Sequence, residues 1–174
     1  MKTISVSEAF CSAPPRRPAV LCLKGPRGRT DMILTEWFNW LNFKRQPMIS
    51  YSMFRSASLG VDLKPGDALV LAFPPVEEAQ RYRQGVRTAA SGQEKELPEG
   101  VHPAAVPGVP VSVPEGSEVA LCCTLAGAYN YPFKKVRIFN CNLEKALGRE
   151  EPALPETTFS ERGGTFRPHR VLAQ

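Results

Sequence analysis

TDMILTEWFNWLNFKRQPMISYSMFRSASLGVDL, residues 30–63, is the most informative stretch of the sequence. Residues 48–53 within it alternate, so that Ile49, Tyr51 and Met53 would share one face of a strand and two serines the other. A period of two is the signature of a β-strand with one face buried. The residues around this strand therefore belong to a sheet, and the rest of the chain can be interpreted from there.

Short apolar runs of strand length lie on both sides of this stretch. The Gly-rich segment KGPRGRT joins the first two runs and predicts a hairpin. The 17 prolines and the many short runs argue against a helical bundle. We therefore predict a mainly β (β-rich α+β) fold. Strands are expected at residues 18–23, 32–38, 48–53, 68–73, 117–125 and 133–143, with a helix at 76–84, an irregular crossover at 86–116 and a turn at 126–132.

The domain organisation predicted from the 174 residues is one domain with a segment at each end. Pro14 and Pro15 predict a loosely held arm without regular helix over residues 1–17. Residues 18–148 form the domain. Residues 149–174 are expected to be a tail that packs on the domain or on a partner copy.

Composition excludes several classes of protein. Apolar residues make up 43% and charged residues 22%, as in ordinary globular proteins. With no signal-peptide layout and no apolar run near the ~20 residues of a membrane helix, we expect a cytoplasmic protein without a membrane partner. The five cysteines form no CxxC pair and the two histidines lie far apart, so neither a disulfide framework nor a metal site is expected.

The net charge of +5 leaves three interpretations open. A basic excess near the start could be a solvated surface, a nucleic-acid patch, or a set of cations near a phosphate-bearing ligand. The nucleic-acid interpretation ranks lowest, because Trp37 and Trp40 lie in strand-like apolar surroundings. The residues concerned are Lys2, Arg16, Arg17, Lys24, Arg27 and Arg29, against Glu8 and Asp31.

Two features of residues 30–63 point to ligand chemistry. Thr35 lies beside Trp37 and Phe38 at a strand end, where backbone groups and rings could hold a planar aromatic ligand. FRSAS, residues 54–58, follows the next strand, and its arginine and serines could form a phosphate cradle with the amides of a tight turn. Each feature alone is weak, and their joint occurrence is what favours a nucleotide-like ligand.

This pattern resembles the FMN-binding split barrels of the flavin-reductase-like (flavoredoxin-like) family. The segments that carry the resemblance are PAVLCLKG, MILTEWF, QPMISYSM, FRSAS and DALVLAFP. The resemblance implies a split β-barrel with short flanking helices, FMN rather than FAD as cofactor, NAD(P)H as a potential co-substrate, and a homodimer with flavin near the interface. Carried over by position, it implies Thr35, Glu36, Trp37 and Phe38 for the ring, and Ser52, Phe54, Arg55, Ser56 and Ser58 for the ribityl-phosphate side.

The sequence also departs from the family pattern. Gln46-Pro47 stands for the usual Pro-Pro, the bulky Trp37 and Phe38 stand near the expected flavin N5, and YNYP at 129–132 replaces a Gly-Asp-His stretch. These changes leave FMN binding open and put nicotinamide use in doubt. The expected function is NAD(P)H-linked flavin reduction or a related oxidoreductase activity, with no catalytic residue assigned. The alternatives are a non-enzymatic electron carrier with a redox protein partner, and a flavin-free interaction protein.

Overall fold

The computed structural model describes residues 1–42, 45–57, 59–60, 62–88, 97–132 and 135–150. The predicted site residue Ser58 and nearly all of the predicted tail, residues 151–174, lie outside the described residues. No helix in the described part of the chain is long and apolar enough to cross a membrane.

The elements are β1 (Lys2–Thr3), α1 (Val6–Ser12), β2 (Val20–Lys24), η1 (Pro26–Gly28), β3 (Thr30–Leu34), β4 (Trp37–Asn42), β5 (Met48–Phe54), β6 (Ala68–Phe73), α2 (Val76–Gln80), β7 (Val86–Arg87), β8 (Pro103–Ala104), β9 (Val113–Pro114), β10 (Val119–Asn130) and β11 (Val136–Gly148).

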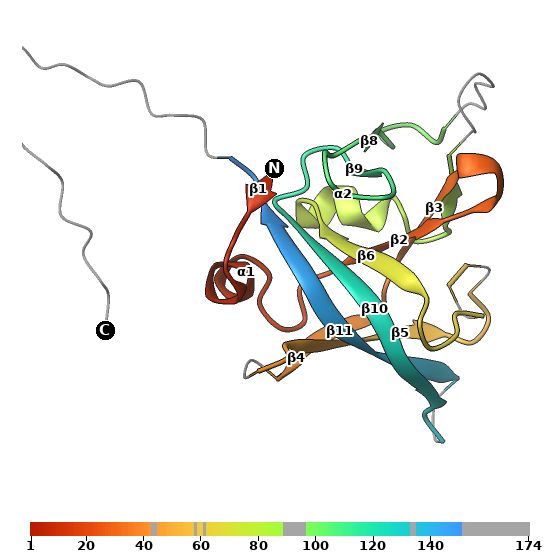
Figure 1. Cartoon of the computed structure of the whole chain (residues 1–174). Helices are drawn as coiled ribbons and strands as arrows, with labels where there is room; N and C mark the ends of the chain where they lie inside the picture. Colours follow the sequence, from red (N-terminus) through yellow and green to blue (C-terminus); the bar gives the residue numbers. More distant parts are fainter. Residues whose placement is uncertain (43–44, 58, 61, 89–96, 133–134, 151–174) are drawn as a thin grey trace, which may run out of the picture.

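One large antiparallel sheet organises the molecule. Its strand order is β4-β5-β11-β10-β6-β2-β3-β7, and β1 pairs with the end of β11. The sheet curls around a common interior, as Figure 1 shows. The short β8 and β9 pair separately, on the same side of the sheet as α2 (Figure 1). The mainly β prediction is thus confirmed, and the curled sheet is that of a split barrel.

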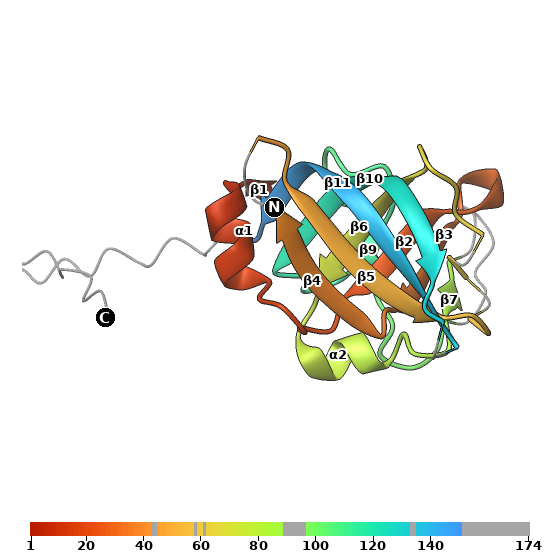
Figure 2. The ribbon, with the colours of Figure 1, turned by 90° about the horizontal axis from the view of Figure 1, so that it is seen from below.

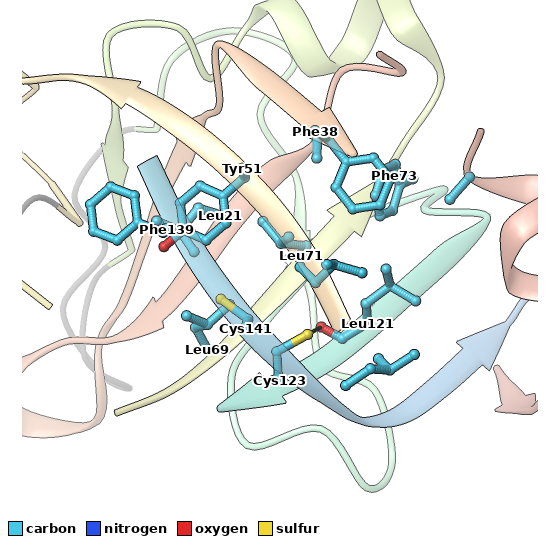
Figure 3. Packing of buried hydrophobic residues seen from close by; sticks show 14 of the residues in the cluster. Leu21, Phe38, Tyr51, Leu69, Leu71, Phe73, Leu121, Cys123, Phe139 and Cys141 are labelled. Carbon is cyan, nitrogen blue, oxygen red and sulfur yellow. Dashed lines mark hydrogen bonds between the residues drawn. The ribbon is translucent and has the colours of Figure 1, made fainter. Parts of the chain in front are cut away.

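The interior of the curled sheet holds the principal core. Tyr51 and Phe139 stack with ring centroids 4.9 Å apart, and Phe38 meets Phe73 edge to face at 4.8 Å. Figure 3 shows these rings together with leucines from β2, β6 and β10 and the thiols of Cys123 and Cys141. The predicted inward face of β5 is confirmed, because Ile49, Tyr51 and Met53 are all buried there.

The outer face of the sheet differs between its two halves. Over β2, β6 and β10 the outward residues, such as Val70, Ala72 and Ala120, are covered by α2, Tyr82 and valines of residues 101–113. We call this the covered face. Because both sides of β6 are buried, its sequence is a continuous apolar run. From the irregular crossover, Val101, Val111 and Val113 are buried in this layer.

Several predicted boundaries are wrong. The run at 32–38 is split, because β3 ends at Leu34 and β4 begins at Trp37. Residues 126–130 continue β10 instead of turning, since each pairs or bulges against β11. The helix at 76–84 is shorter than predicted: α2 ends at Gln80, a turn follows, and Gly85 with φ +77° redirects the chain into β7.

The N-terminal arm is also not as predicted. Its first residues form β1, which pairs Lys2 with Gly148, and α1 then buries Ala9 in the core. A capping box explains this helix: the Ser5 side chain accepts the Glu8 N–H, and the Glu8 carboxylate accepts the Ser5 N–H. The prolines only end the helix, so the expectation of a loosely held, non-helical arm is wrong.

Candidate functional site

The break between β3 and β4 is the first structural element of the site. The Thr35 N–H and hydroxyl both donate to the Ala19 carbonyl, at 2.8 and 3.0 Å, and the side chain is buried. The next N–H, that of Glu36, donates to the Ser52 carbonyl at 2.8 Å. These bonds tie the break to β2 on one side and to β5 on the other. Thr35 therefore stabilises the strand break, and its hydroxyl is already used in a hydrogen bond to the backbone.

An outward-facing row of side chains crosses four strands next to this break. Trp37 of β4 pairs with Ser52 of β5, Ser52 with Ile138 of β11, and Ile138 with Tyr129 of β10. Residues two apart on a strand share a face, so Phe54 lies on the same side as Ser52. We call this outer surface over β4, β5, β11 and the end of β10 the open face. In Figure 2 these strands lie side by side across the front, with α1 and α2 at the margins.

The open face carries large apolar side chains that are exposed. Trp37 is 37% exposed, Phe54 45% and Tyr129 51%, whereas Ser52 between them is 5% exposed. The small Ser52 thus lies beside the larger, exposed rings of Trp37 and Phe54. Such a surface fits a flat ligand, because aromatic rings prefer offset-stacked or edge-to-face contacts with other rings.

The FRSA segment at the end of β5 is a tight turn, as predicted. The Ala57 N–H donates to the Phe54 carbonyl at 3.0 Å, which puts Arg55 and Ser56 at the two central positions. The Arg55 N–H donates to the Lys135 carbonyl at 2.8 Å, and its guanidinium reaches the Tyr131 carbonyl at 3.4 Å. Both side chains are exposed. The turn can therefore present a cation and a hydroxyl to an anion a few residues from Ser52.

A hollow of about 150 Å³ lies on the other side of Trp37. Its lining includes Thr35, Glu36 and Trp37 from the strand break, Arg16 and Arg17 from the segment after α1, and Arg83 from the turn after α2. Pro18, Leu34 and Gln80 complete it. We call this the basic hollow. It brings together residues that are far apart in the sequence, and it borders the same Trp37 that borders the open face.

The predicted site residues thus fall into three groups. Glu36, Trp37, Phe54, Arg55 and Ser56 are exposed between the strand break and the turn, and Ser52, paired with Trp37, is a buried small residue beside them. Thr35 and Phe38 are buried, and the Phe38 ring packs against Trp40 and Phe73 inside the barrel. Ser58 lies outside the described residues. The role of all of these residues in ligand binding stays a prediction.

Sequence reasoning missed Gln80 and Arg83 altogether. Arg16 and Arg17 belong to the early basic excess, for which cations near a phosphate were one of three interpretations. Nothing in the local sequence connects Arg83 to them, because the connection is made by tertiary structure: the Leu34 N–H donates to the Tyr82 carbonyl at 3.0 Å.

The cysteines do not contribute an activated thiol to this surface. All five are free, and only Cys11 is exposed. Burial raises the pKa of Cys22, Cys122 and Cys123, and it raises the pKa of Cys141 to about 12. The buried thiols therefore stay protonated at neutral pH, where a thiolate would be the reactive form.

No family model and no curated protein matches this sequence. Solved structures do match, at low sequence identity. The NADH:FAD oxidoreductase of Streptomyces globisporus C-1027 superimposes with a TM-score of 0.57 at 11% identity, over 82% of this chain and 81% of that one. An FMN-binding protein from Thermus thermophilus gives a TM-score of 0.58 at 18% identity, with coverages of 81% and 76%. Flavoredoxin from Methanosarcina acetivorans gives 0.55 at 13% identity, with coverages of 79% and 71%.

These superpositions cover most of both chains in each comparison. They agree with the mainly β architecture and with the curled antiparallel sheet described above. The chain therefore has the split-barrel fold of the flavin-reductase-like proteins.

Proposed function

We propose that this chain binds a flavin on the open face and acts as an oxidoreductase, with NAD(P)H-linked flavin reduction as its activity. The ring system lies over Ser52 beside Trp37, and the phosphate tail lies at the turn of Arg55 and Ser56. The single observation that carries this proposal is that the exposed rings of Trp37 and Phe54 lie beside the small Ser52, directly next to the Arg-Ser turn. The fold supports it, since solved proteins of this fold include flavin reductases and a flavoredoxin.

The residues present fit a flavin. Trp37 and Phe54 are exposed on either side of the small Ser52 and can contact a planar ring system. Arg55 and Ser56 offer charge-assisted and hydroxyl hydrogen bonds to a phosphate. The turn provides one compact cradle, which favours FMN over FAD as the cofactor.

A bound flavin would supply the redox chemistry, by accepting a hydride and passing on its electrons. The residues of this chain bind and orient. Arg55 neutralises the phosphate, the hydrogen bonds of Thr35 and Glu36 hold the strand break rigid, and Trp37 limits access to the ring. No proton-transfer pair is needed from the protein for this step.

We further propose that two copies pair through the open face. Trp37, Phe54 and Tyr129 are large apolar side chains exposed there. Contiguous exposed apolar side chains mark interaction surfaces in globular proteins. A second copy would bury these rings and enclose the flavin from the side that one chain leaves open. Light scattering on the purified protein tests this, and Tyr129→Glu should shift a dimer towards monomer.

Flavin titration followed by anaerobic reduction tests the proposed activity. We expect FMN to bind with quenching of its fluorescence, and NADH or NADPH to bleach the bound flavin. Failure of FMN and FAD to bind would overturn the proposal. Binding without reduction by either nicotinamide nucleotide, but with reduction by a reduced protein donor, would make the chain an electron carrier.

A further inference from the structure

The basic hollow contains two arginines whose guanidiniums form no ion pair within the described residues. Arg17 is engaged: its guanidinium is 2.6 Å from the Glu118 carboxylate and also donates to the carbonyls of Ser12 and Pro74. Arg16 and Arg83 differ from it. Within the described residues, neither guanidinium has an ion pair or a hydrogen bond, and both side chains are exposed.

The backbone at Arg16 adopts an unfavourable conformation. The Arg17 N–H donates to the Pro14 carbonyl at 3.2 Å and closes a turn, in which Arg16 has φ +67°. Glycine or asparagine is usual at such a position, because other side chains pay a conformational cost there. The Arg16 N–H also donates to the Phe38 carbonyl at 2.9 Å, which fixes this conformation beside the strand break. The chain thus holds a strained arginine at the rim of the hollow.

Arg83 lines the hollow from the turn after α2, and independent bonds hold that turn. The Leu34 N–H and the Gly85 N–H both donate to the Tyr82 carbonyl, each at 3.0 Å, so the turn after α2 is fixed to the end of β3. Two arginines from separate segments therefore line one cavity. Guanidinium groups bind phosphate oxygens in bidentate geometry, which makes such a pair suited to a phosphate.

We infer that Arg16 and Arg83 form an anion subsite that takes a phosphate group of a second nucleotide, separate from the flavin phosphate at Arg55 and Ser56. The inference extends the proposed function, because the neighbouring Trp37 would lie between the two ligands. The volume of about 150 Å³ is below the roughly 300–1,000 Å³ of pockets that enclose a whole drug-sized ligand. The hollow thus holds one group of a nucleotide whose remainder lies over the adjoining surface.

One residue of the hollow opposes anion binding. Glu36 lines it with an exposed carboxylate, so its charge reduces the attraction exerted by the two arginines. The arginines and the glutamate should therefore have opposite effects on the affinity for an anion. Removing Arg16 or Arg83 should weaken an anion, and removing the charge of Glu36 should strengthen it.

The test is calorimetric titration of the full chain at low salt with 2′-phospho-ADP-ribose, ADP-ribose, inorganic phosphate and FMN. We expect 2′-phospho-ADP-ribose or ADP-ribose to bind, and Arg16→Gly and Arg83→Gln each to weaken that binding about tenfold, the size of one lost charge-assisted bond. Glu36→Gln should strengthen it. FMN affinity should stay unchanged in both arginine variants.

The matched control is Arg27→Gln, because Arg27 is exposed, also has a positive φ, and lies at the far end of the β2–β3 hairpin. Arg16→Gly has a second readout: it relieves the backbone conformation, so thermal stability should not fall. A drop in stability with unchanged nucleotide affinity would make Arg16 structural and overturn the inference.

Other outcomes separate this inference from the proposed function. If the arginine variants weaken FMN as much as 2′-phospho-ADP-ribose, the hollow holds the flavin's own phosphate and the inference fails. If inorganic phosphate binds as tightly as the nucleotides, the nucleotide assignment fails. If FMN does not bind but 2′-phospho-ADP-ribose binds through Arg16 and Arg83, the proposed function fails and the anion subsite stands.

Discussion

The covered face and the open face belong to the same curled sheet but are built for different tasks. Over β2, β6 and β10 the outward side chains are small or β-branched and lie beneath α2 and the valines of residues 101–113. Over β4, β5 and β11 the outward side chains include rings, small polar residues and the aliphatic Ile138, and the rings of Trp37 and Phe54 are exposed. The difference teaches that, among the described residues, α2 and the valines close one half of the sheet, whereas the rings of Trp37, Phe54 and Tyr129 stay exposed on the other. The exposed half is the one to which we assign the ligand.

The largest expected effect compares one tyrosine on each face. Tyr82→Ala should lower the free energy of unfolding by roughly 3–5 kcal/mol, because it empties a buried site against β2 and β6. Tyr129→Ala should change the stability of the monomer by less than about 1 kcal/mol, since that ring is half exposed. Urea denaturation at low protein concentration measures both. Equal losses would show that the two faces do not differ as described.

The next effect is on binding at the open face. Replacing Arg55 and Ser56 together by alanine should weaken FMN by roughly 2–4 kcal/mol, through the loss of charge-assisted hydrogen bonds. Fluorescence titration measures it. Arg45→Ala is the matched control, because Arg45 is exposed at the opposite end of the β4–β5 hairpin. Unchanged FMN affinity in the double variant would exclude the turn as the phosphate site.

Alkaline pH tests the interior that both faces share. Burial raises the pKa of Cys141 from 9.0 to about 12, so the folded state favours the protonated thiol. Its contribution to stability is complete below pH 9 and is lost as pH rises towards 12. At pH 11 the loss from Cys141 alone should be about 3 kcal/mol, at 1.36 kcal/mol for each of the two pH units above 9, and the other buried thiols add to it in the same direction. Urea denaturation at pH 8 and pH 11 checks this, and Cys11→Ala, at an exposed thiol, should show the same pH dependence as the native chain.

The smallest expected effect concerns access to the ring. Trp37→Ser should let a nicotinamide nucleotide approach more closely and speed reduction of bound FMN several-fold, with less than about 1.4 kcal/mol removed from the barrier. Anaerobic stopped-flow reduction by NADPH measures the rate. Leu41→Ser is the control, since Leu41 is exposed on the same strand further from the break. A rate no faster than that of the native chain would remove Trp37 as a gate.

Local sequence pattern predicted the elements whose signals are local. The alternation of residues 48–53 and the apolar run of β6 identify strands and their buried faces without any tertiary information. Residues 126–130 misled because Gly127 and Asn130 resemble turn residues, whereas pairing with β11 keeps them in a strand. In the N-terminal arm the Ser5-to-Glu8 spacing was a helix signal that the prolines obscured.

The parts of the candidate site that cluster in the sequence could be predicted, whereas the parts formed by contacts between distant segments could not. Residues 35–38 and 54–58 stand out because aromatic, Arg and Ser residues cluster in sequence beside strands. The basic hollow depends on long-range bonds from the Arg16 N–H to the Phe38 carbonyl and from the Leu34 N–H to the Tyr82 carbonyl, which no local pattern encodes. No local pattern encodes the split of residues 32–38 into two strands either. The split accompanies the long-range bond from the Glu36 N–H to the Ser52 carbonyl.

The two tryptophans lie in opposite environments. Trp40 is buried, and its indole N–H donates to the Ala13 carbonyl at 2.8 Å, whereas Trp37 is partly in solvent at the strand break. Their emission should therefore report on separate events. In a Trp40→Phe variant, the emission of the remaining Trp37 would report on ligand binding at the open face. In a Trp37→Phe variant, the emission of the remaining Trp40 would report on whether α1 stays docked. The unlabelled protein therefore contains two separate fluorescent probes.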